Sequence, residues 1–275
     1  MKDYPLVSVV LATYNWKPER ISKSIESVIN QTYSNIEFII VNDASTNNIE
    51  NTILSYVKKF KNIIYLKNDK NCERSYSRNR WIFESSWKYI AFMDDDDVWC
   101  DEDKIKKQVE FLESHDNYVL CWTCGIAVDK DWKEFAELNM LSWDKEIRHK
   151  LLWSNQFLLA SAMVKKDVLL FSGRFRTEFN KTEDYDLRLR IWQYWKIDNL
   201  NSKSIQYRTW IWNTTTTSWM HMKKLALKSI CLNRKTYYWF FWAFVKRIFG
   251  LLIPYRLKFK VYKLSHKENQ LISNL

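Results

Sequence analysis

Glycine is scarce in this chain, and its scarcity excludes two ways of holding a nucleotide. The 275 residues include only three glycines, Gly125, Gly173 and Gly250. A dinucleotide-binding turn needs several closely spaced glycines, and a P-loop needs glycines followed by Lys and Ser or Thr. Three glycines this far apart can build neither motif. If a nucleotide binds to this chain, a glycine-rich loop does not cradle its phosphates.

Paired cysteines and long apolar runs are also lacking. The five cysteines are an odd number, and Cys121 and Cys124 have the spacing of half a zinc site without a second pair. We therefore expect reduced thiols and, because no signal-peptide pattern precedes them, a cytoplasmic protein. The apolar run 237–245 ends at Lys246, which is too soon for a helix that spans a bilayer.

Aromatic residues and positive charge are abundant. Trp, Tyr and Phe each occur 15 times, and the formal net charge is +11. A positive excess of this size favours an anionic partner, such as nucleic acid, a membrane surface or a phosphorylated substrate. The fraction of hydrophobic residues, 47%, is ordinary for a folded domain with a sizeable core.

Apolar runs alternate with helical patterns through residues 1–123. We predict strands over residues 6–12, 36–41, 63–66, 89–93 and 118–122. Helices are predicted from Pro18, after a cap at Ser45 or Thr46, over residues 75–87 and from Asp101. This order predicts an α/β fold with a Rossmann-like, mostly parallel sheet that helices cover on both faces.

The pattern weakens after residue 124. We predict strands over residues 157–164 and 204–212, and helices over 166–171, from Glu183 through Tyr194, and over 223–249. Residues 1–222 are interpreted as one catalytic domain with a nucleotide-binding half (1–123) and an acceptor half (124–222). Residues 223–275 are predicted to be a helical region rich in aromatic and basic side chains.

Three of the predicted strands end in polar residues. The first strand leads into Asn15, the second into Asp43, and the fourth into the run Asp94-Asp95-Asp96-Asp97. In a parallel sheet these ends lie at one edge, which is where ligands bind. Four adjacent carboxylates repel one another, and a divalent cation with hard oxygen ligands would neutralise them. The alternative is an acidic turn exposed to solvent.

Several segments resemble the family 2 glycosyltransferases. Residues 8–15, 27–33 and 37–46 resemble the amino-terminal half of that family, residues 90–99 its Asp-x-Asp segment, and residues 182–190 its Glu-Asp helix. The resemblance implies a GT-A-like fold, a nucleotide-diphospho-sugar donor, Mn²⁺ or Mg²⁺, and inversion at the sugar carbon. The sequence departs from the family at Ala12, where proline is common, at Ala44, where glycine is common, and at residues 71–72, which often include glycine.

Asp43 is the candidate residue for recognition of the donor's base. A carboxylate accepts a hydrogen bond from a ring N–H, which uracil and thymine present and cytosine does not. Together with the resemblance, this favours a UDP-sugar, with Ala12, Tyr14 and Asn15 completing the contacts to the base and ribose. The alternative role for Asp43 is an N-cap on the following helix.

The diphosphate of the donor needs positive charge around it. By resemblance Asp94 and Asp96 are the two motif aspartates and the candidate metal ligands, while Asp95 is expected to reach the metal through water or to contact the ribose. Arg74 and Arg78 can pair with a phosphate, or each can form an ordinary surface salt bridge.

The Glu-Asp segment supplies the candidate general base. Asp184, next to Glu183, is expected to take the proton of the acceptor hydroxyl, which implies an inverting displacement and a β-linkage. Arg188 lies one helical turn further on and could orient Asp184, or the two could form a simple pair on the helix surface.

These features predict the transfer of a hexose (glucose or galactose, N-acetylated or not) to a lipid-linked saccharide acceptor. The pathway would be bacterial cell-surface polysaccharide assembly: O-antigen, lipopolysaccharide or capsule. Tyr237–Val245, followed by Lys246 and Arg247, suits a peripheral position on the inner face of the cell membrane, or else a helix packed on the catalytic domain. Alternative functions are a sugar nucleotidyltransferase and a non-enzymatic nucleic-acid-binding protein; we expect no nucleic-acid partner.

Overall fold

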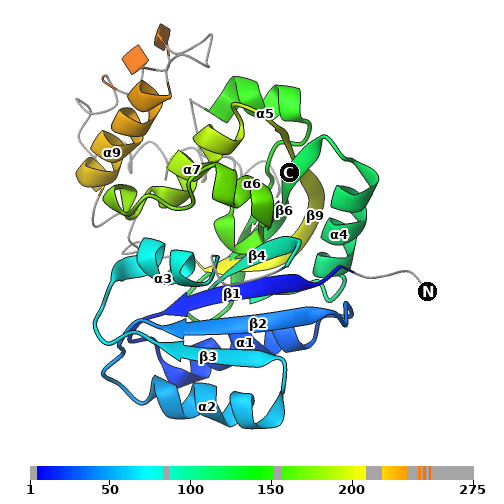
Figure 1. The fold of residues 1–275 in the computed structure, drawn as a ribbon, viewed down its shortest axis with the longest axis vertical. Helices are drawn as coiled ribbons and strands as arrows, with labels where there is room; N and C mark the ends of the chain where they lie inside the picture. Colours follow the sequence, from blue (N-terminus) through cyan, green and yellow to red (C-terminus); the bar gives the residue numbers. More distant parts are fainter. Residues whose placement is uncertain are drawn as a thin grey trace, which may run out of the picture.

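The computed structural model describes residues 5–82, 87–151, 157–208 and 219–233, with positions 241, 242, 244, 245 and 248. Within these ranges nine strands form one sheet, in the order β3-β2-β1-β4-β8-β6-β9-β5, with β7 paired to β6. Helices pack against both faces of this sheet (Figure 1). The predicted α/β architecture with a mostly parallel sheet is therefore confirmed.

Three of the four parallel strand pairs lie in the first half of the chain. Its elements are β1 (Val7–Thr13), α1 (Pro18–Ile29), β2 (Ile36–Asn42), α2 (Ile49–Lys59), β3 (Ile63–Lys67), α3 (Glu73–Ile82), β4 (Tyr89–Asp94), β5 (Val98–Trp99) and α4 (Lys104–Ser114). Strand β1 pairs in parallel with β2 and β4, and β2 pairs in parallel with β3. The carboxyl ends of β1, β2 and β4 consequently lie side by side, as the sequence predicted.

The second half completes the same sheet. Its elements are β6 (Tyr118–Val128), β7 (Glu134–Leu138), α5 (Asp144–Leu151), β8 (Met163–Lys165), α6 (Lys166–Phe171), α7 (Glu183–Ile191), β9 (Lys196–Arg208) and α9 (Trp219–Leu232). Strand β8 lies antiparallel between β4 and β6, and β6 pairs in parallel with β9. Strands from both halves therefore share one hydrogen-bonded sheet.

Several predicted boundaries are wrong for identifiable reasons. Helix α2 begins at Ile49, after Ser45 and Thr46, because the hydroxyl groups of Ser45 and Thr46 form hydrogen bonds with Asn15 in the loop after β1 instead. Residues 157–164 are mostly not a strand, since Leu159–Ser161 forms a 3₁₀ turn before the short β8. Tyr194 lies beyond the end of α7. Parts of the predicted 204–212 strand and 223–249 helix fall outside the described residues.

Alternation along the strands gives each face of the sheet its own hydrophobic core. Val7, Val9 and Leu11 of β1 belong to the core under α1, α2 and α4, whereas Val10 belongs to the core under α3 and α7. Successive strand residues point to opposite faces, so a continuous apolar run such as β1 is buried on both. This double burial fixes the position of β1 and hence of the loop that follows it.

Lys104 is a buried lysine within the first of these cores. Its Nζ donates to Gln108 Oε1 at 2.8 Å and lies 3.9 Å from the centroid of the Trp99 ring, and the residue is 0% exposed. Burial disfavours the ammonium form and lowers the pKa of Lys104 to about 7.

This lowered pKa predicts that stability rises with pH above neutrality. An unfolded lysine keeps its proton to about pH 10, so between pH 7 and 10 the unfolded chain binds more protons than the folded one. The free energy of unfolding of the wild type should rise by about 2.5 kcal/mol from pH 7 to 9 relative to Lys104→Met, measured by urea denaturation. Parallel pH profiles of the two proteins would contradict this prediction.

Candidate active site

A cavity of about 320 Å³ opens beside the carboxyl ends of β1 and β2. It brings together six of the residues predicted from the sequence: Ala12, Tyr14, Asn15, Asp43, Arg74 and Asp95. The other lining residues were not among the predicted site residues; they are Thr13, Trp16, Asn71, Glu73, Ser77, Asn180 and Lys181. The last two precede α7, so a segment from the second half of the chain closes one side of this cavity.

The loops after β1 and β2 are fastened to each other. The Asp43 amide donates to Thr13 O at 2.8 Å, and the Asn15 amide donates to Ser45 Oγ at 2.9 Å. In return, the Thr46 amide donates to Asn15 Oδ1 at 2.8 Å. A contact between Asn15 and the nucleotide-sugar stays a prediction. Because the side-chain oxygen is already engaged, such a contact would use the side-chain nitrogen Nδ2.

Asp43 is held by one oxygen and open at the other. Its Oδ1 accepts hydrogen bonds from Asn68 Nδ2 at 2.6 Å and from the Cys72 amide at 2.9 Å. Helix α2 begins six residues later at Ile49, so the alternative role of Asp43 as a helix N-cap is wrong. Among the described residues Oδ2 accepts no hydrogen bond, which leaves it available to a ligand in the cavity.

Four residues on or beside the rim of the cavity adopt positive φ angles although none is glycine. They are Asn15 (φ 54°), Ala44 (φ 61°), Glu73 (φ 70°) and Lys181 (φ 76°). Left-handed backbone strains residues with a Cβ atom, and such strain gathers at ligand-binding loops. At Ala44 it explains why a glycine is common in the resembling family: the turn requires φ above zero.

Replacing Ala44 by glycine should therefore stabilise the protein. Relief of the left-handed strain exceeds the extra entropy that glycine loses, so Ala44→Gly should raise the free energy of unfolding by about 0.5–1 kcal/mol. Ala12→Gly, in the interior of β1, should lower it by about the same amount. Urea denaturation of both variants tests this, and a loss of stability in Ala44→Gly would refute the strain argument.

Arg78 joins the two acidic motifs. Its Nη2 donates to Asp94 Oδ1 at 2.6 Å and its Nη1 donates to Glu183 Oε1 at 2.7 Å. The residue is 3% exposed, and its guanidinium lies between carboxylates from the end of β4 and the start of α7. A phosphate contact by Arg78 stays a prediction. The two ion pairs show that Arg78 links the end of β4 to the start of α7.

Arg74, one helical turn before Arg78, faces the cavity instead. Although partial desolvation in the cavity opposes its charge, the carboxylates of Asp94, Asp95 and Asp96 raise the pKa of Arg74 above the usual arginine value. A cation that lines the cavity and lies beside the acidic run is placed to meet a phosphate that enters there.

The four aspartates after β4 have different surroundings. Asp97 is 0% exposed, and its Oδ1 accepts a hydrogen bond from the Arg208 amide at 2.8 Å, which ties the end of β9 to this turn. Burial, together with the charge of the neighbouring aspartates, raises the pKa of Asp96 to about 7. Burial also raises the pKa of Asp95 to about 6, against the opposing charge of Arg74. Burial, together with the charge of neighbouring aspartates, thus favours the protonated forms of Asp95 and Asp96, whereas a divalent cation would favour the ionised carboxylates.

The donor set fits a cation that arrives with the substrate. Among the described residues no group of three or more His, Cys, Asp or Glu side chains is arranged to hold a metal by itself. Mg²⁺ usually binds through one or two carboxylates together with substrate phosphates. Asp96 and the second oxygen of Asp94 would be those carboxylates. Cys121 and Cys124 are buried free thiols on β6, as expected.

Asp184 lies in the first turn of α7, half-buried and directly after Glu183. Arg188, on the same helix, is 1% exposed, and its guanidinium lies 4.6 Å from the centroid of the Phe157 ring and 5.3 Å from that of Tyr185. The role of Asp184 as a base, and that of Arg188 in orienting it, stay predictions. The sequence placed both on the correct helix.

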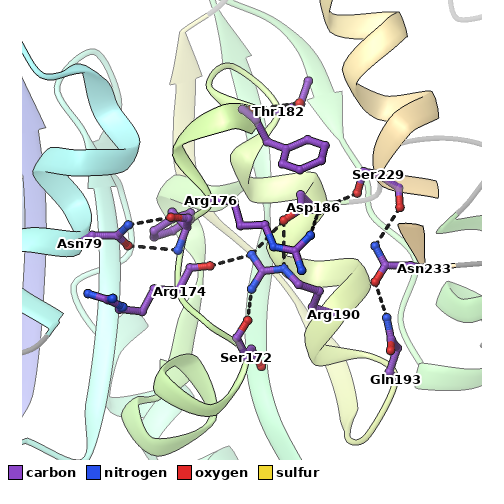
Figure 2. A network of polar contacts seen from close by, with 12 residues as sticks. Asn79, Ser172, Arg174, Arg176, Thr182, Asp186, Arg190, Gln193, Ser229 and Asn233 are labelled. Atoms are coloured by element: carbon purple, nitrogen blue, oxygen red, sulfur yellow. Dashed lines mark hydrogen bonds and ion pairs between the residues drawn. The ribbon is translucent and has the colours of Figure 1, made fainter. Parts of the chain in front are cut away.

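A polar network beneath α7 holds this helix in place (Figure 2). At its centre Asp186, 0% exposed, accepts from Arg190 Nε at 2.9 Å and from Ser229 Oγ of α9 at 2.9 Å. Arg190 in turn donates to the carbonyls of Ser172 and Arg174. The helix that carries Asp184 is thus bonded to α9 and to the segment after α6. This role of Asp186 was not predicted from the sequence.

Comparisons with known proteins show the family of this chain. Residues 8–171 match the sequence profile of "Glycosyl transferase family 2". The chain is 30% identical over 272 residues to an uncharacterised glycosyltransferase of Methanocaldococcus jannaschii, which covers 92% of this chain and 91% of that protein. It is also 37% identical over 121 residues to the Escherichia coli UDP-Glc:alpha-D-GlcNAc-diphosphoundecaprenol beta-1,3-glucosyltransferase WfaP, covering 42% of this chain and 47% of that one.

The fold is that of solved glycosyltransferases. The mannosyltransferase PcManGT from Pyrobaculum calidifontis, solved in complex with GDP-Man and Mn²⁺, superposes with a TM-score of 0.64 at 13% identity. The match covers 85% of this chain and 65% of that chain. A likeness of this extent shows a shared GT-A fold. Together with the sequence profile and the full-length relative, it shows that this chain is a member of glycosyltransferase family 2.

Proposed function

We propose that this protein transfers a hexosyl group from a UDP-sugar to a lipid-linked saccharide and forms a β-glycosidic bond by inversion. The observation that carries the proposal is the cavity at the ends of β1 and β2, where the free oxygen of Asp43 and the cation of Arg74 lie in one space. A uracil N–H at one end and a diphosphate at the other would satisfy both. This function is favoured over a sugar nucleotidyltransferase or a nucleic-acid-binding protein by the family to which the chain belongs.

Recognition of the base would rest on Asp43. Its carboxylate oxygen Oδ2 accepts the N3–H of uracil while Oδ1 stays bonded to Asn68 and Cys72. Ala12 and Tyr14 would contact the base and ribose from the loop after β1. The E. coli relative WfaP takes UDP-Glc by its name, which supports the choice of nucleotide.

The diphosphate would be held by Arg74 and by the carboxylates of Asp94 and Asp96 through Mn²⁺ or Mg²⁺, with Asp95 near the ribose. The cation would act as a Lewis acid that stabilises charge on the leaving diphosphate. The Mn²⁺ complex of PcManGT supports a metal in this fold.

Asp184 would act as the general base. Its carboxylate takes the proton of the acceptor hydroxyl while the acceptor oxygen bonds to the anomeric carbon of the sugar and the bond to the diphosphate breaks. UDP leaves from the opposite face of the sugar, next to Arg74, so the configuration inverts. Arg78 would hold the first turn of α7 at a fixed distance from Asp94 during this displacement.

The acceptor would be presented at a membrane. WfaP acts by its name on a diphosphoundecaprenol-linked sugar, and the chain carries an aromatic and basic segment over residues 237–260. In the part of the chain that the structure describes, no helix is long and apolar enough to cross a bilayer. We propose peripheral binding on the cytoplasmic face, with 1–222 as the catalytic domain and 223–275 as the membrane-associating region, in bacterial cell-surface polysaccharide assembly.

A donor screen tests this function. The purified protein, with Mn²⁺, is incubated with UDP-, GDP- and dTDP-hexoses, and release of the nucleoside diphosphate is followed with and without a diphospholipid-linked saccharide. We expect turnover with at least one UDP-sugar, and its loss in Asp43→Leu, with Asp69→Leu as the control at an exposed aspartate. No turnover with any donor, or turnover confined to a GDP-sugar, would refute the proposal.

A further inference from the structure

An exposed group of apolar side chains lies where α6 and α7 end, away from the cavity. This aromatic patch consists of Leu170, Phe171 and Tyr194, which are 38%, 69% and 67% exposed, and of Trp195, which is half-buried. The rings of the last three meet edge to face, with centroids 5.2 to 5.7 Å apart. Contiguous exposed apolar side chains of this kind mark interaction surfaces, because single scattered ones are the rule elsewhere.

The backbone beneath the aromatic patch is rigidly held. Arg190, anchored by Asp186, donates to the carbonyls of Ser172 and Arg174, which fastens the end of α6 to α7 (Figure 2). Arg148 donates to the carbonyls of Trp192 and Trp195 at 2.7 Å each. The patch is thus preorganised, and little conformational freedom remains to be lost when it binds a partner.

The aromatic patch adjoins the end of α9. A hydrogen bond from Gln193 Nε2 to Asn233 Oδ1 joins the turn that carries Tyr194 to the end of that helix, where Leu232 is 55% exposed. The chain continues from there into residues 234–275, which contain nine Lys or Arg residues and one acidic residue, Glu268. These residues, which follow the end of α9 in the sequence, carry a net charge of +8 (nine basic minus one acidic) out of the formal +11.

Basic residues also flank the patch itself. Lys166 begins α6, one turn before Leu170. Arg174 follows Phe171 by three residues, and Lys196 follows Trp195 directly. Asp167 is the one acidic residue of α6. Aromatic rings beside lysine and arginine suit the headgroup region of a bilayer, where rings reach the acyl boundary and cations meet anionic phosphates.

We infer that the aromatic patch docks this protein on an anionic phospholipid surface. The inference rests on the proposed lipid-linked acceptor, and it names the surface that faces the lipid. Helix α7 carries the patch near its end and Asp184 in its first turn, and its nine residues span about 13 Å. Docking through a rigid helix would hold the base at a fixed height above the headgroups, where a membrane-anchored saccharide ends.

Vesicle binding by the full-length protein tests this inference. Sedimentation is measured with vesicles of phosphatidylcholine alone and of phosphatidylcholine with phosphatidylglycerol. The wild type should bind the anionic vesicles more tightly than the vesicles of phosphatidylcholine alone. The double variant Phe171→Ser/Tyr194→Ser should bind the anionic vesicles at least about tenfold more weakly than the wild type does. Phe135→Ser, which removes a 53% exposed phenylalanine from β7, should bind as the wild type does.

Three results would overturn the inference. The first is that the wild type does not bind anionic vesicles, and the second is that the double variant binds them as tightly as the wild type. The third is a molar mass that rises with protein concentration in light scattering for the wild type but not for the double variant. That result would assign the patch to a contact with a second copy of the chain. UDP release from the donor without vesicles should be unchanged in the double variant. If the wild type releases no UDP from any donor, the proposed function is refuted. The vesicle measurement would still test the docking surface independently.

Discussion

Arg78→Met is expected to cost about 3–5 kcal/mol of stability and to abolish most of the transferase activity. The substitution removes the cation between Asp94 and Glu183 and leaves two carboxylates without their ionic partner, of which Glu183 is 4% exposed. Removing one partner of a buried ion pair has this magnitude, because the remaining charge is neither solvated nor paired. The free energy of unfolding is measured by urea denaturation without any ligand. If Arg78 only bound the phosphate of the donor, its substitution would leave this free energy unchanged.

Arg74→Met is the matched control, one helical turn away on the cavity side. Because the side chain of Arg74 is exposed whereas Arg78 is 3% exposed, Arg74→Met should lower the free energy of unfolding by less than Arg78→Met does, while weakening the binding of UDP. Adding Glu183→Gln to Arg78→Met should restore part of the lost stability, because one of the two buried charges disappears; coupling of about 0.5–3 kcal/mol is typical of contacting residues. Equal effects of Arg74→Met and Arg78→Met on stability would refute the bridging role of Arg78.

Asp184→Asn is expected to lower kcat by about 10²- to 10⁴-fold and to leave the affinity for UDP with Mn²⁺ nearly unchanged. The amide keeps the shape of the side chain but cannot accept the proton of the acceptor hydroxyl, and general bases contribute a factor of this size. Transfer to the acceptor saccharide is measured at saturating donor, and UDP binding by calorimetry.

Glu178→Gln provides the control for Asp184→Asn, since Glu178 is an exposed carboxylate in the turn before the same helix. It should retain full transfer. If Asp184→Asn loses UDP binding together with transfer, Asp184 belongs to the donor site. If it loses neither, the base is another group.

The edge of the sheet at which the site lies could be predicted because it depends on local pattern. Apolar runs fix β1, β2 and β4, and polar residues at their ends must then converge in a parallel sheet. Asp43, Asp95 and Arg74 accordingly lie where the sequence placed them, around one cavity.

The contacts that organise the site could not be predicted in the same way. Arg78 and Glu183 are 105 residues apart, and no periodicity indicates which of several arginines reaches across. Asp186 reads in the sequence as a surface residue of a short helix, yet it is fully buried because α9 and the segment after α6 cover it. The Arg78–Glu183 ion pair and the burial of Asp186 both depend on how the elements pack in three dimensions. A sequence shows the order of these elements but not their packing.

Strands β5 and β7 were not predicted, and β8 was predicted with the wrong bounds, for a related reason. Strand β5 has two residues and β8 three, which is below the length at which alternation can be recognised. Strand β7 is largely exposed and carries charged residues, so it lacks an apolar signature. Pairing with β9, β4 and β6, respectively, makes these segments strands.

The antiparallel strand β8 has a consequence for how the chain folds during synthesis. Residues 7–94 can pair β1 to β4 as soon as they leave the ribosome, but β4 then presents an open edge until Met163–Lys165 emerges. Unpaired edges of apolar strands invite pairing with other chains, and contacts distant in sequence form slowly. The nascent protein therefore has an interval of about 70 residues, several seconds of translation, in which its donor half is exposed to aggregation and to chaperones.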